Sequence, residues 1–386
     1  MDKVRLGIIG LGNIGRYHAG YLLDGKIERC ELVAVCDAFP KALEAYKEKG
    51  LKAFTDGEEF IRSGEVDAVI VATPHFQHTT LGIAALQAGV HVMVEKPISA
   101  HMADAERLIA EAEKNPKVVF GGMFQMRSEP RYQKLKKIID DGQLGKLLRI
   151  NWIDTDWFRS DAYYSSSAWR ATWKGEGGGV TLNQCLHQLD IFSWLFGMPS
   201  QVRGFAQLGR FHEIEVEDSV TAYMEFPGGM TGVFISSTGE IPGTSRLEVV
   251  GTQGKVVLEN EKLTFIRNEV ASDEWNRTSP TGFDQPDQWT IDVPFGNADM
   301  PHASYIQNFV EAILDGTELR VPGQEGIHSI ELANAITYSS LVEKTIELPL
   351  DSKAWEDKLN KLAAESTMEK KVKEASKEDF TKSFRR

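Results

Sequence analysis

The chain has few cysteines, and this scarcity excludes a disulfide-stabilised scaffold. Its 386 residues include only Cys30, Cys36 and Cys185, an odd number without a C-x-x-C pair. We therefore expect a reducing compartment, the cytoplasm. No apolar run approaches the roughly 18 residues that a membrane span needs, so no membrane segment is expected. The N-terminus enters a strand-like pattern directly, which predicts that there is no signal peptide.

Basic residues are also in short supply. The chain has 43 Lys and Arg against 56 Asp and Glu, which gives a net charge of −13. An acidic chain repels phosphate backbones, so nucleic acid and anionic membranes are not expected as partners. Hydrophobic residues make up 42% and charged residues 26%, as in ordinary globular proteins. The length suggests two or three domains.

The first 125 residues alternate between two periodicities. Short, nearly continuous apolar runs are separated by segments of helical pattern. This alternation predicts a doubly wound α/β domain with a parallel sheet covered on both faces. The strands are expected at residues 4–9, 32–36, 66–72, 90–94 and 117–121.

The pattern changes after residue 125. Between residues 201 and 267, short strand-like runs are joined by Gly and Pro turns, which predicts an antiparallel sheet. Helices are expected near residues 129–140, 180–196, 305–314 and 324–342, so residues 126–350 should form a second, α+β domain. The Lys/Glu-rich tail, residues 351–386, is expected to be a solvated helix or a frayed end.

A glycine-rich turn follows the first strand. Residues 10–15 read G-x-G-x-x-G and open a helix, and Asp37 ends the next strand. This context predicts a dinucleotide site, with the pyrophosphate at the helix N-terminus. The carboxylate of Asp37 suits ribose hydroxyls and repels a 2′-phosphate, so NAD is expected rather than NADP. The residues expected to contact the cofactor here are Gly10, Gly12, Asn13, Ile14 and Asp37.

Two later strands end in Pro-containing turns, Ala72–His75 and Glu95–Pro97. Strand ends of a parallel sheet share one edge, so these turns should pass the cofactor. His75 and His78 have H-x-x-H spacing without a third ligand nearby, and no metal is expected. The cofactor contacts expected from these turns and the following helix are Ala72, Thr73, His78, Glu95 and Lys96.

Together with the run Gly177–Val180, Asn183 and His187, these motifs closely resemble the Gfo/Idh/MocA oxidoreductases over about residues 3–345. The resemblance implies a Rossmann domain joined to a large, mostly antiparallel sheet, through which dimers or tetramers form. It also implies oxidation or reduction of a sugar or polyol alcohol by NAD or NADP. The matching catalytic pair is Lys96 and His187. Asn183 departs from the family, because inositol dehydrogenase-like members often have Asp at this position.

These residue types suit hydride transfer from an alcohol. The Lys96 ammonium can stabilise alkoxide character, and an imidazole at position 187 can exchange the hydroxyl proton. Asn183 should lie one helical turn before His187 on the same face, and Asp190 could orient the imidazole. Aromatic and polar side chains around the expected cleft suit a sugar ring. The substrate contacts expected beyond Lys96, Asn183 and His187 are Gln125, Arg127, Tyr163, Trp169 and Arg170.

Two other functions fit the same motifs. One is an NAD-cycling glycoside hydrolase or epimerase that oxidises its sugar transiently. The other is a non-enzymatic NAD-sensing regulator, whose mark would be loss of the lysine or the histidine. Both Lys96 and His187 are present, which favours an enzyme.

Overall fold

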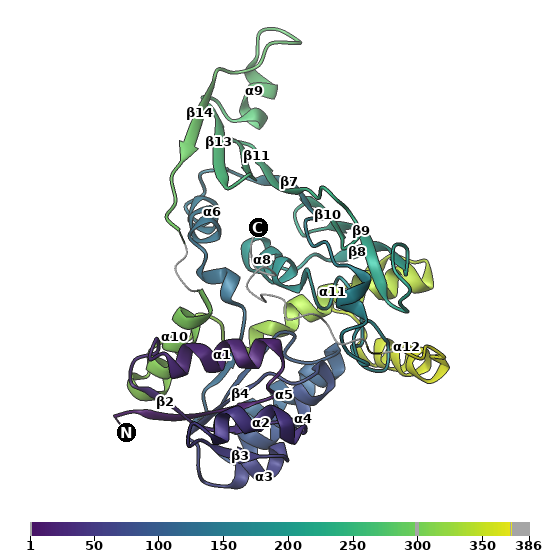
Figure 1. The fold of residues 1–386 in the computed structure, drawn as a ribbon. Coiled ribbons are helices and arrows are strands. Elements are labelled where there is room, and N and C mark those ends of the chain that lie inside the picture. The colour runs from purple at the N-terminus through teal and green to yellow at the C-terminus, as the bar shows by residue number, and fades with distance from the viewer. Residues whose placement is uncertain (1, 298–300, 371, 373–386) are drawn as a thin grey trace.

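The computed structural model describes residues 2–297, 301–370 and 372, and its first unit is a parallel sheet covered by helices on both faces (Figure 1). The sheet has the strand order β3-β2-β1-β4-β5-β6. Its strands are β1 Val4–Ile9, β2 Cys30–Cys36, β3 Lys52–Phe54, β4 Ala68–Val71, β5 His91–Val94 and β6 Phe120–Gly122. The helices between them are α1 Asn13–Leu23, α2 Pro40–Lys47, α3 Gly57–Arg62, α4 His75–Gln87 and α5 Met102–Lys114. The expected doubly wound fold is confirmed.

The apolar runs form the central strands of this sheet. All four residues of β4 are buried, because helices cover both of its faces. The strand order reverses between β1 and β4, and in such sheets this switch point opens a crevice at the carboxyl ends of the strands. The glycine-rich turn, which follows β1, therefore lies at the mouth of the crevice.

The second unit is built on a nine-stranded sheet of order β14-β13-β12-β11-β7-β10-β9-β8-β15. Its neighbours pair antiparallel except β10 and β7, which confirms the expected, mostly antiparallel sheet. The strands are β7 Leu147–Asp154, β8 Gln201–Leu208, β9 Glu217–Glu225, β10 Thr231–Ser237, β11 Ser245–Gly251, β12 Gly254–Glu259, β13 Lys262–Asn268, β14 Gln288–Val293 and β15 Ile346–Glu347.

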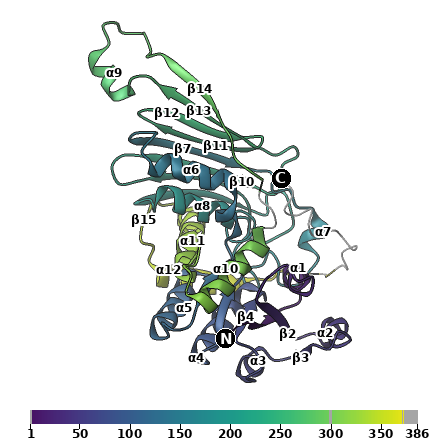
Figure 2. The same ribbon diagram turned by 90° about the vertical axis from the view of Figure 1, so that its left-hand side faces the viewer.

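Helices α6 (Pro130–Asp140), α8 (Leu186–Phe196) and α11 (Gly326–Val342) lie on one side of this sheet (Figure 2). The core between helix and sheet is aromatic: Trp152 stacks on Phe192 at 6.4 Å and meets Phe234 edge-on at 6.1 Å, measured between ring centroids. The strands alternate buried and exposed residues, as β9 shows, which indicates that within the described residues no helix layer covers the other face of the sheet. The remaining helical elements are η1 Gln125–Ser128, α7 Asp161–Tyr164, α9 Ser272–Thr278, α10 Pro301–Asp315, η2 Gly323–Glu325 and α12 Ser352–Glu365.

Helix α10 comes from the second half of the chain but packs beside α1 (Figure 1). His302, in α10, meets the ring of Tyr17 edge-on at 5.4 Å. The chain thus returns to the first unit after the nine-stranded sheet. The boundaries expected at residues 125 and 350 remain our proposal for how the chain divides.

The helix expected over residues 180–196 begins only at Leu186. The preceding residues form turns because their backbone N–H groups donate hydrogen bonds to Glu217, at the start of β9. One oxygen of its carboxylate accepts hydrogen bonds from the N–H of Gly179 at 2.9 Å and of Thr181 at 3.1 Å. The expectation that Asn183 lies in the same helix as His187 is therefore wrong.

The described part of the C-terminal tail is docked on the protein rather than solvated. Trp355 and Leu359 of α12 are 1% and 2% exposed, and α12 packs against α5. Farther along, Lys370 donates hydrogen bonds to the carbonyl oxygens of Tyr164, at 3.0 Å, and Arg170. Of the two alternatives expected for the tail, a solvated helix or a frayed end, the helix is present as α12, with one face packed on the protein. The rest of that expectation concerns residues 371 and 373–386, outside the described residues.

Among the residues that the structure describes, no helix is long and apolar enough to cross a membrane.

Candidate active site

A cavity of about 2850 Å³ begins at the carboxyl ends of β1, β2, β4 and β5 and extends to the second unit. The expected site residues that line it are Gly10, Gly12, Asn13, Ile14, Asp37, Ala72, Thr73, His78, Glu95, Lys96, Gln125, Tyr163, Trp169, Arg170, Asn183 and His187. The two units thus contribute to one space, although these residues lie far apart in sequence.

The glycine-rich turn has the shape that a dinucleotide needs. Gly10 has a φ of +93°, and a Cβ there would lie 2.6 Å from the carbonyl oxygen of Ala72. A Cβ on Gly15 would lie 1.9 Å from the carbonyl oxygen of Gly10, so helix and strand can pack only around glycine. A Cβ on Gly12 would meet nothing within 4 Å, and Gly12 caps α1 without a side-chain bond. The first N–H groups of α1 are therefore suited to hold a pyrophosphate.

Asp37 is held in place at the end of β2. Its two carboxylate oxygens accept hydrogen bonds from the backbone N–H of Leu11, at 2.7 Å, and of Phe39, at 2.8 Å. Asp37 lines the cavity, whereas Lys41, four residues later, is not among the lining residues. This arrangement fits the ribose of NAD.

His78 connects the turns after β4 and β5. Its ring nitrogens lie 2.7 Å from the carbonyl oxygens of Thr73 and Pro97, and the residue is 1% exposed. These nitrogens therefore face the backbone, which leaves only ring carbons for the expected cofactor contact. Glu95 is also buried: it hydrogen-bonds His18 at 2.6 Å and accepts from the N–H of Lys96 at 3.0 Å.

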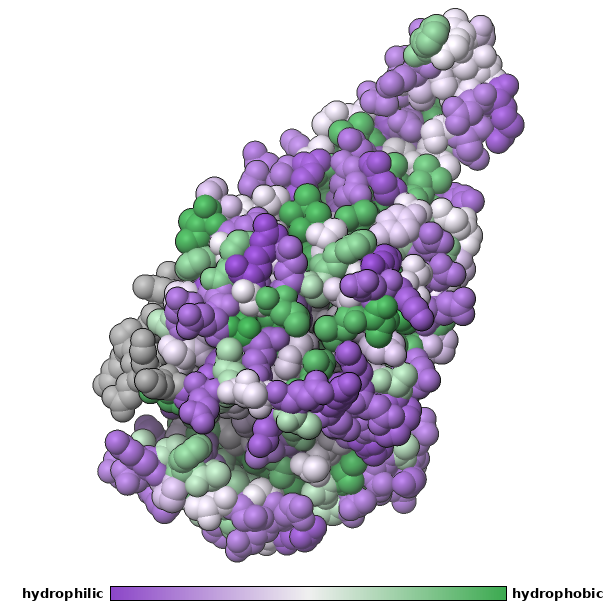
Figure 3. Space-filling model, turned by 90° about the vertical axis from the view of Figure 1, so that its right-hand side faces the viewer, coloured by the Kyte–Doolittle hydropathy of each residue, from purple (hydrophilic) through white to green (hydrophobic). Residues whose placement is uncertain are grey.

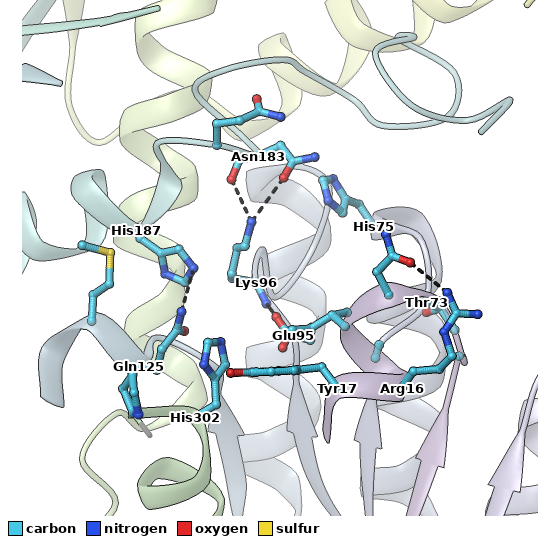
Figure 4. Close-up of a pocket in the computed structure, with 18 of the residues that line it drawn as sticks. Arg16, Tyr17, Thr73, His75, Glu95, Lys96, Gln125, Asn183, His187 and His302 are labelled. Atoms are coloured by element: carbon cyan, nitrogen blue, oxygen red, sulfur yellow. Dashed lines mark hydrogen bonds between the residues drawn. The ribbon is translucent and has the colours of Figure 1, made fainter. Parts of the chain in front are cut away.

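Lys96 follows β5 and reaches across to the second unit (Figure 4). Its Nζ donates to the backbone oxygen of Asn183 at 2.8 Å and to the Oδ1 of Asn183 at 3.2 Å. Burial lowers the pKa of Lys96 to about 8, against the opposing effect of Glu95 and Glu176. The ammonium is thus poised to lose its proton within a moderately alkaline range.

His187 lies in the first turn of α8 and is 6% exposed. Its Nε2 lies 3.3 Å from the amide nitrogen of Gln125, a geometry in which the amide donates and the imidazole accepts. Figure 4 shows His187 and Lys96 entering the same space from different units. A neutral imidazole with an accepting Nε2 can take up a proton there.

Arg127, expected to bind substrate, is held instead in an ion-pair network with Asp190 and Glu325. Its guanidinium is buried and forms a two-pronged ion pair with Asp190, with nitrogen–oxygen distances of 2.6 and 2.8 Å, and a further bond to Glu325. Arg127 is not among the residues that line the cavity. Both oxygens of Asp190 accept hydrogen bonds from Arg127, and its suggested role in orienting His187 stays a prediction.

The aromatic loop forms one wall of the cavity. The Arg170 guanidinium lies over the rings of Tyr163, at 4.3 Å, and Trp169, at 4.7 Å. Trp169 in turn meets the ring of His75 edge-on at 5.5 Å. Aromatic faces beside a cation suit the C–H faces and hydroxyls of a sugar.

Three polar residues near the site were not singled out from the sequence. Glu176 is buried within the glycine run and contacts Asn183 and Arg170. Arg159 lines the cavity and lies over the rings of Trp157 and Tyr163. His302 arrives from α10 and lines the cavity too. The G-E-G-G-G run was a usable signal for Glu176, whereas nothing local marks His302.

Within the described ranges, no group of three or more His, Cys, Asp or Glu side chains is placed to hold a metal ion. His75 instead uses its Nδ1 on the carbonyl oxygen of Glu176, at 3.0 Å.

Two family models match the chain. Residues 4–123 match the oxidoreductase family with an NAD-binding Rossmann fold, and residues 132–257 match the GFO/IDH/MocA C-terminal domain. The myo-inositol 2-dehydrogenase of Thermotoga maritima is 30% identical over 280 residues, which cover 68% of this chain and 77% of the relative. The inositol 2-dehydrogenase of Rhizobium meliloti is 27% identical over 89% of this chain and 99% of its own length.

A solved structure has the same architecture. The WlbA dehydrogenase from Bordetella pertussis, in complex with NADH and UDP-GlcNAcA, superimposes with a TM-score of 0.76 at 27% identity. The match covers 90% of this chain and 100% of that chain. These three relatives are all dehydrogenases, so they give no support to a glycoside hydrolase, an epimerase or a regulator. The chain belongs to the GFO/IDH/MocA family of oxidoreductases and is built on that family's NAD-binding Rossmann fold.

Proposed function

We propose that this chain is an NAD-dependent dehydrogenase that oxidises a secondary alcohol of a sugar or cyclic polyol, with Lys96 and His187 as its catalytic pair. The observation that carries the proposal is the convergence of these two side chains on one cavity beside the glycine-rich turn (Figure 4). One comes from the end of a Rossmann strand and the other from a helix of the second unit.

Each residue of the site has a distinct proposed role. The N-terminus of α1 and Asp37 hold the dinucleotide, and bound NAD supplies a hydride acceptor. His187 takes the hydroxyl proton on its Nε2. The Lys96 ammonium donates to the same oxygen and stabilises the negative charge that develops there. Asn183 holds Lys96, and Gln125 donates to His187 until the substrate hydroxyl arrives.

The substrate end favours a ring with several hydroxyls. Trp169 and Tyr163 offer aromatic faces, and Arg170 and Gln184 offer donors beside them. The names of the relatives, inositol dehydrogenases and a dehydrogenase solved with a nucleotide sugar acid, fit this class. We propose a sugar, a polyol or a sugar derivative as the small-molecule partner.

We also propose a homo-oligomer, a dimer or a tetramer that associates through the face of the nine-stranded sheet opposite the helices. Hydrophobic side chains are exposed on strands of this sheet, among them Phe205 at 55% and Tyr223 at 40%. Figure 3 views the molecule from the side opposite to Figure 2 and shows hydrophobic patches among the hydrophilic residues. Burying such patches favours association.

The cytoplasm is our proposal for the compartment. It rests on Cys30, Cys36 and Cys185, which are unpaired cysteines, two of them buried.

The experiment is an absorbance screen at the NADH band with purified protein, with NAD and NADP in parallel, across inositols, free sugars, sugar acids and nucleotide sugars. NADH formation with one substrate class, and a preference for NAD, is the expected result. Absence of turnover in every arm, together with no binding of NAD, would overturn the proposal. Tightly held cofactor without net NADH would favour the cycling hydrolase or epimerase instead.

A further inference from the structure

Glu176 is a buried carboxylate with an unusual set of neighbours. It lies between the aromatic loop and the glycine run and is 1% exposed. One oxygen accepts a hydrogen bond from the N–H of Ala171, and the other accepts from the side-chain NH₂ of Asn183. A nitrogen of Arg170 lies 3.7 Å from the second oxygen. Burial raises the pKa of Glu176, whereas Arg170 and the donors on both oxygens favour its ionised form.

Asn183 lies between Glu176 and Lys96. Its NH₂ donates to Glu176, and its Oδ1 accepts from the Lys96 Nζ at 3.2 Å. An amide carries one donor end and one acceptor end, so its orientation is set by what each end faces. Without an acceptor at position 176, the NH₂ group could turn toward the ammonium and remove one of its two hydrogen bonds.

We propose that Glu176 is a positioning residue for the dehydrogenase reaction: its carboxylate orients the Asn183 amide so that the oxygen faces Lys96, and its negative charge supports the ammonium. This inference rests on the proposed role of Lys96. It is consistent with the electrostatics of the site, since Glu176 opposes the burial that lowers the pKa of Lys96.

The proposal explains why an amide suits position 183. In this chain an Asp at position 183 would contact the Glu176 carboxylate, and two buried carboxylates in contact cannot both stay ionised. The negative charge in this chain therefore lies on Glu176, and the Asn183 amide stands between that carboxylate and Lys96, with its oxygen facing the ammonium.

The hydrogen-bond pattern predicts how substitutions combine. In Glu176→Gln the side chain has one oxygen and one NH₂, so it cannot accept from both Ala171 and Asn183. In the double variant Glu176→Gln/Asn183→Asp, the Gln oxygen accepts from Ala171, its NH₂ donates to the new carboxylate, and that carboxylate accepts from Lys96. Every donor again has an acceptor, and the charge lies directly beside the ammonium.

The test compares kcat and the pH profile of kcat/KM for the parent enzyme and the variants Glu176→Gln, Asn183→Asp and the double variant. Glu176→Gln is expected to lower kcat by about 10–100-fold, as for groups that orient a catalytic side chain, and to move the alkaline limb of the profile to lower pH. The double variant should recover most of the loss and return that limb toward the parent position.

Glu215→Gln is the matched control. Glu215 contacts the same loop, through the N–H of Trp173 at 3.3 Å, but does not line the cavity. Its removal should leave kcat and the profile unchanged. Unfolding midpoints and NAD affinity, measured for every variant, separate a folding defect from a positioning one.

Two results would overturn the proposal: parent-like kcat and profile in Glu176→Gln, or a double variant no faster than Glu176→Gln. If Glu176→Gln does not fold, the proposal is tested by comparing kcat of Asn183→Asp with kcat of the double variant. Only Asn183→Asp holds two carboxylates in contact, so it should be the slower of the two. Equal rates in that pair would overturn the proposal as well. A parent enzyme that turns over no alcohol would refute the proposed function instead, a separable outcome.

Discussion

Lys96→Met separates catalysis from stability. The methionine keeps an unbranched, apolar side chain of similar length but cannot donate to an alkoxide. If Lys96 stabilises the developing charge, kcat should fall by about 10²–10³-fold, the usual loss for one donor at such a site. NAD affinity should fall far less than kcat, because the N-terminus of α1 and Asp37, which we propose to hold the dinucleotide, are untouched although Lys96 is itself an expected cofactor contact.

The same substitution should not destabilise the fold. Burial lowers the pKa of Lys96 from 10.5 to about 8, which corresponds to ~3 kcal/mol against the ammonium in the folded state. The loss of the two hydrogen bonds to Asn183 has the opposite effect and lowers the free energy of unfolding by about 1–3 kcal/mol. The free energy of unfolding below pH 8 should therefore change by no more than about 2 kcal/mol, with gain as the expected direction.

The pH dependence has a definite sign. Between pH 8 and 10.5 the unfolded lysine still binds its proton while the folded one has lost it, so the parent gains stability from this group as pH rises. The advantage of the methionine variant should shrink over that window. The assays are NADH formation at saturating substrate and urea unfolding at pH 7 and pH 10, with the exposed Lys114→Met as control. A kcat within threefold of the parent would falsify this role for Lys96.

Three further predictions concern other parts of the molecule. Asp37→Ser should lower kcat/KM for NAD by about tenfold and raise that for NADP, because a charged acceptor for the ribose is lost; an unchanged ratio of the two would contradict the cofactor assignment. Arg127→Met should lower the free energy of unfolding by about 3–5 kcal/mol, since it leaves the buried Asp190 unpaired, and urea unfolding against the exposed Arg62→Met measures this. Lys370→Met should raise KM for the sugar several-fold, on the order of the 1 kcal/mol of a lost hydrogen bond, without changing NAD affinity; an unchanged KM would show that the tail does not support the aromatic loop.

The dinucleotide end could be predicted from the sequence because its determinants are local. Gly10, Gly12 and Gly15 lie within six residues: Gly10 adopts a positive φ, Gly12 leaves open space at the helix N-terminus, and Gly15 has no room for a Cβ against Gly10. Asp37 follows one strand later, at the same edge of the sheet. A pattern confined to one βαβ unit carries its own structural context.

The substrate end was predicted less well because its determinants are distant in sequence. Arg127 meets Asp190 across 63 positions, and no local pattern shows that this arginine is neutralised. The N-terminal part of the helix expected at residues 180–196 is lost because Glu217, from a later strand, binds its backbone. Glu176 was not predicted because its partners Arg170, Ala171 and Asn183 come together only in the folded loop.

The proposed mechanism requires Lys96 and His187 to act on one oxygen, and a double-variant cycle measures that directly. The single-turnover rate of NADH formation is compared for the parent, Lys96→Met, His187→Ala and the combination. Groups that act as a unit in one transition state give losses that do not multiply, so the combined variant should be about as slow as the slower single variant. A combined loss equal to the product of the two single losses, or a single variant as fast as the parent, would contradict the account.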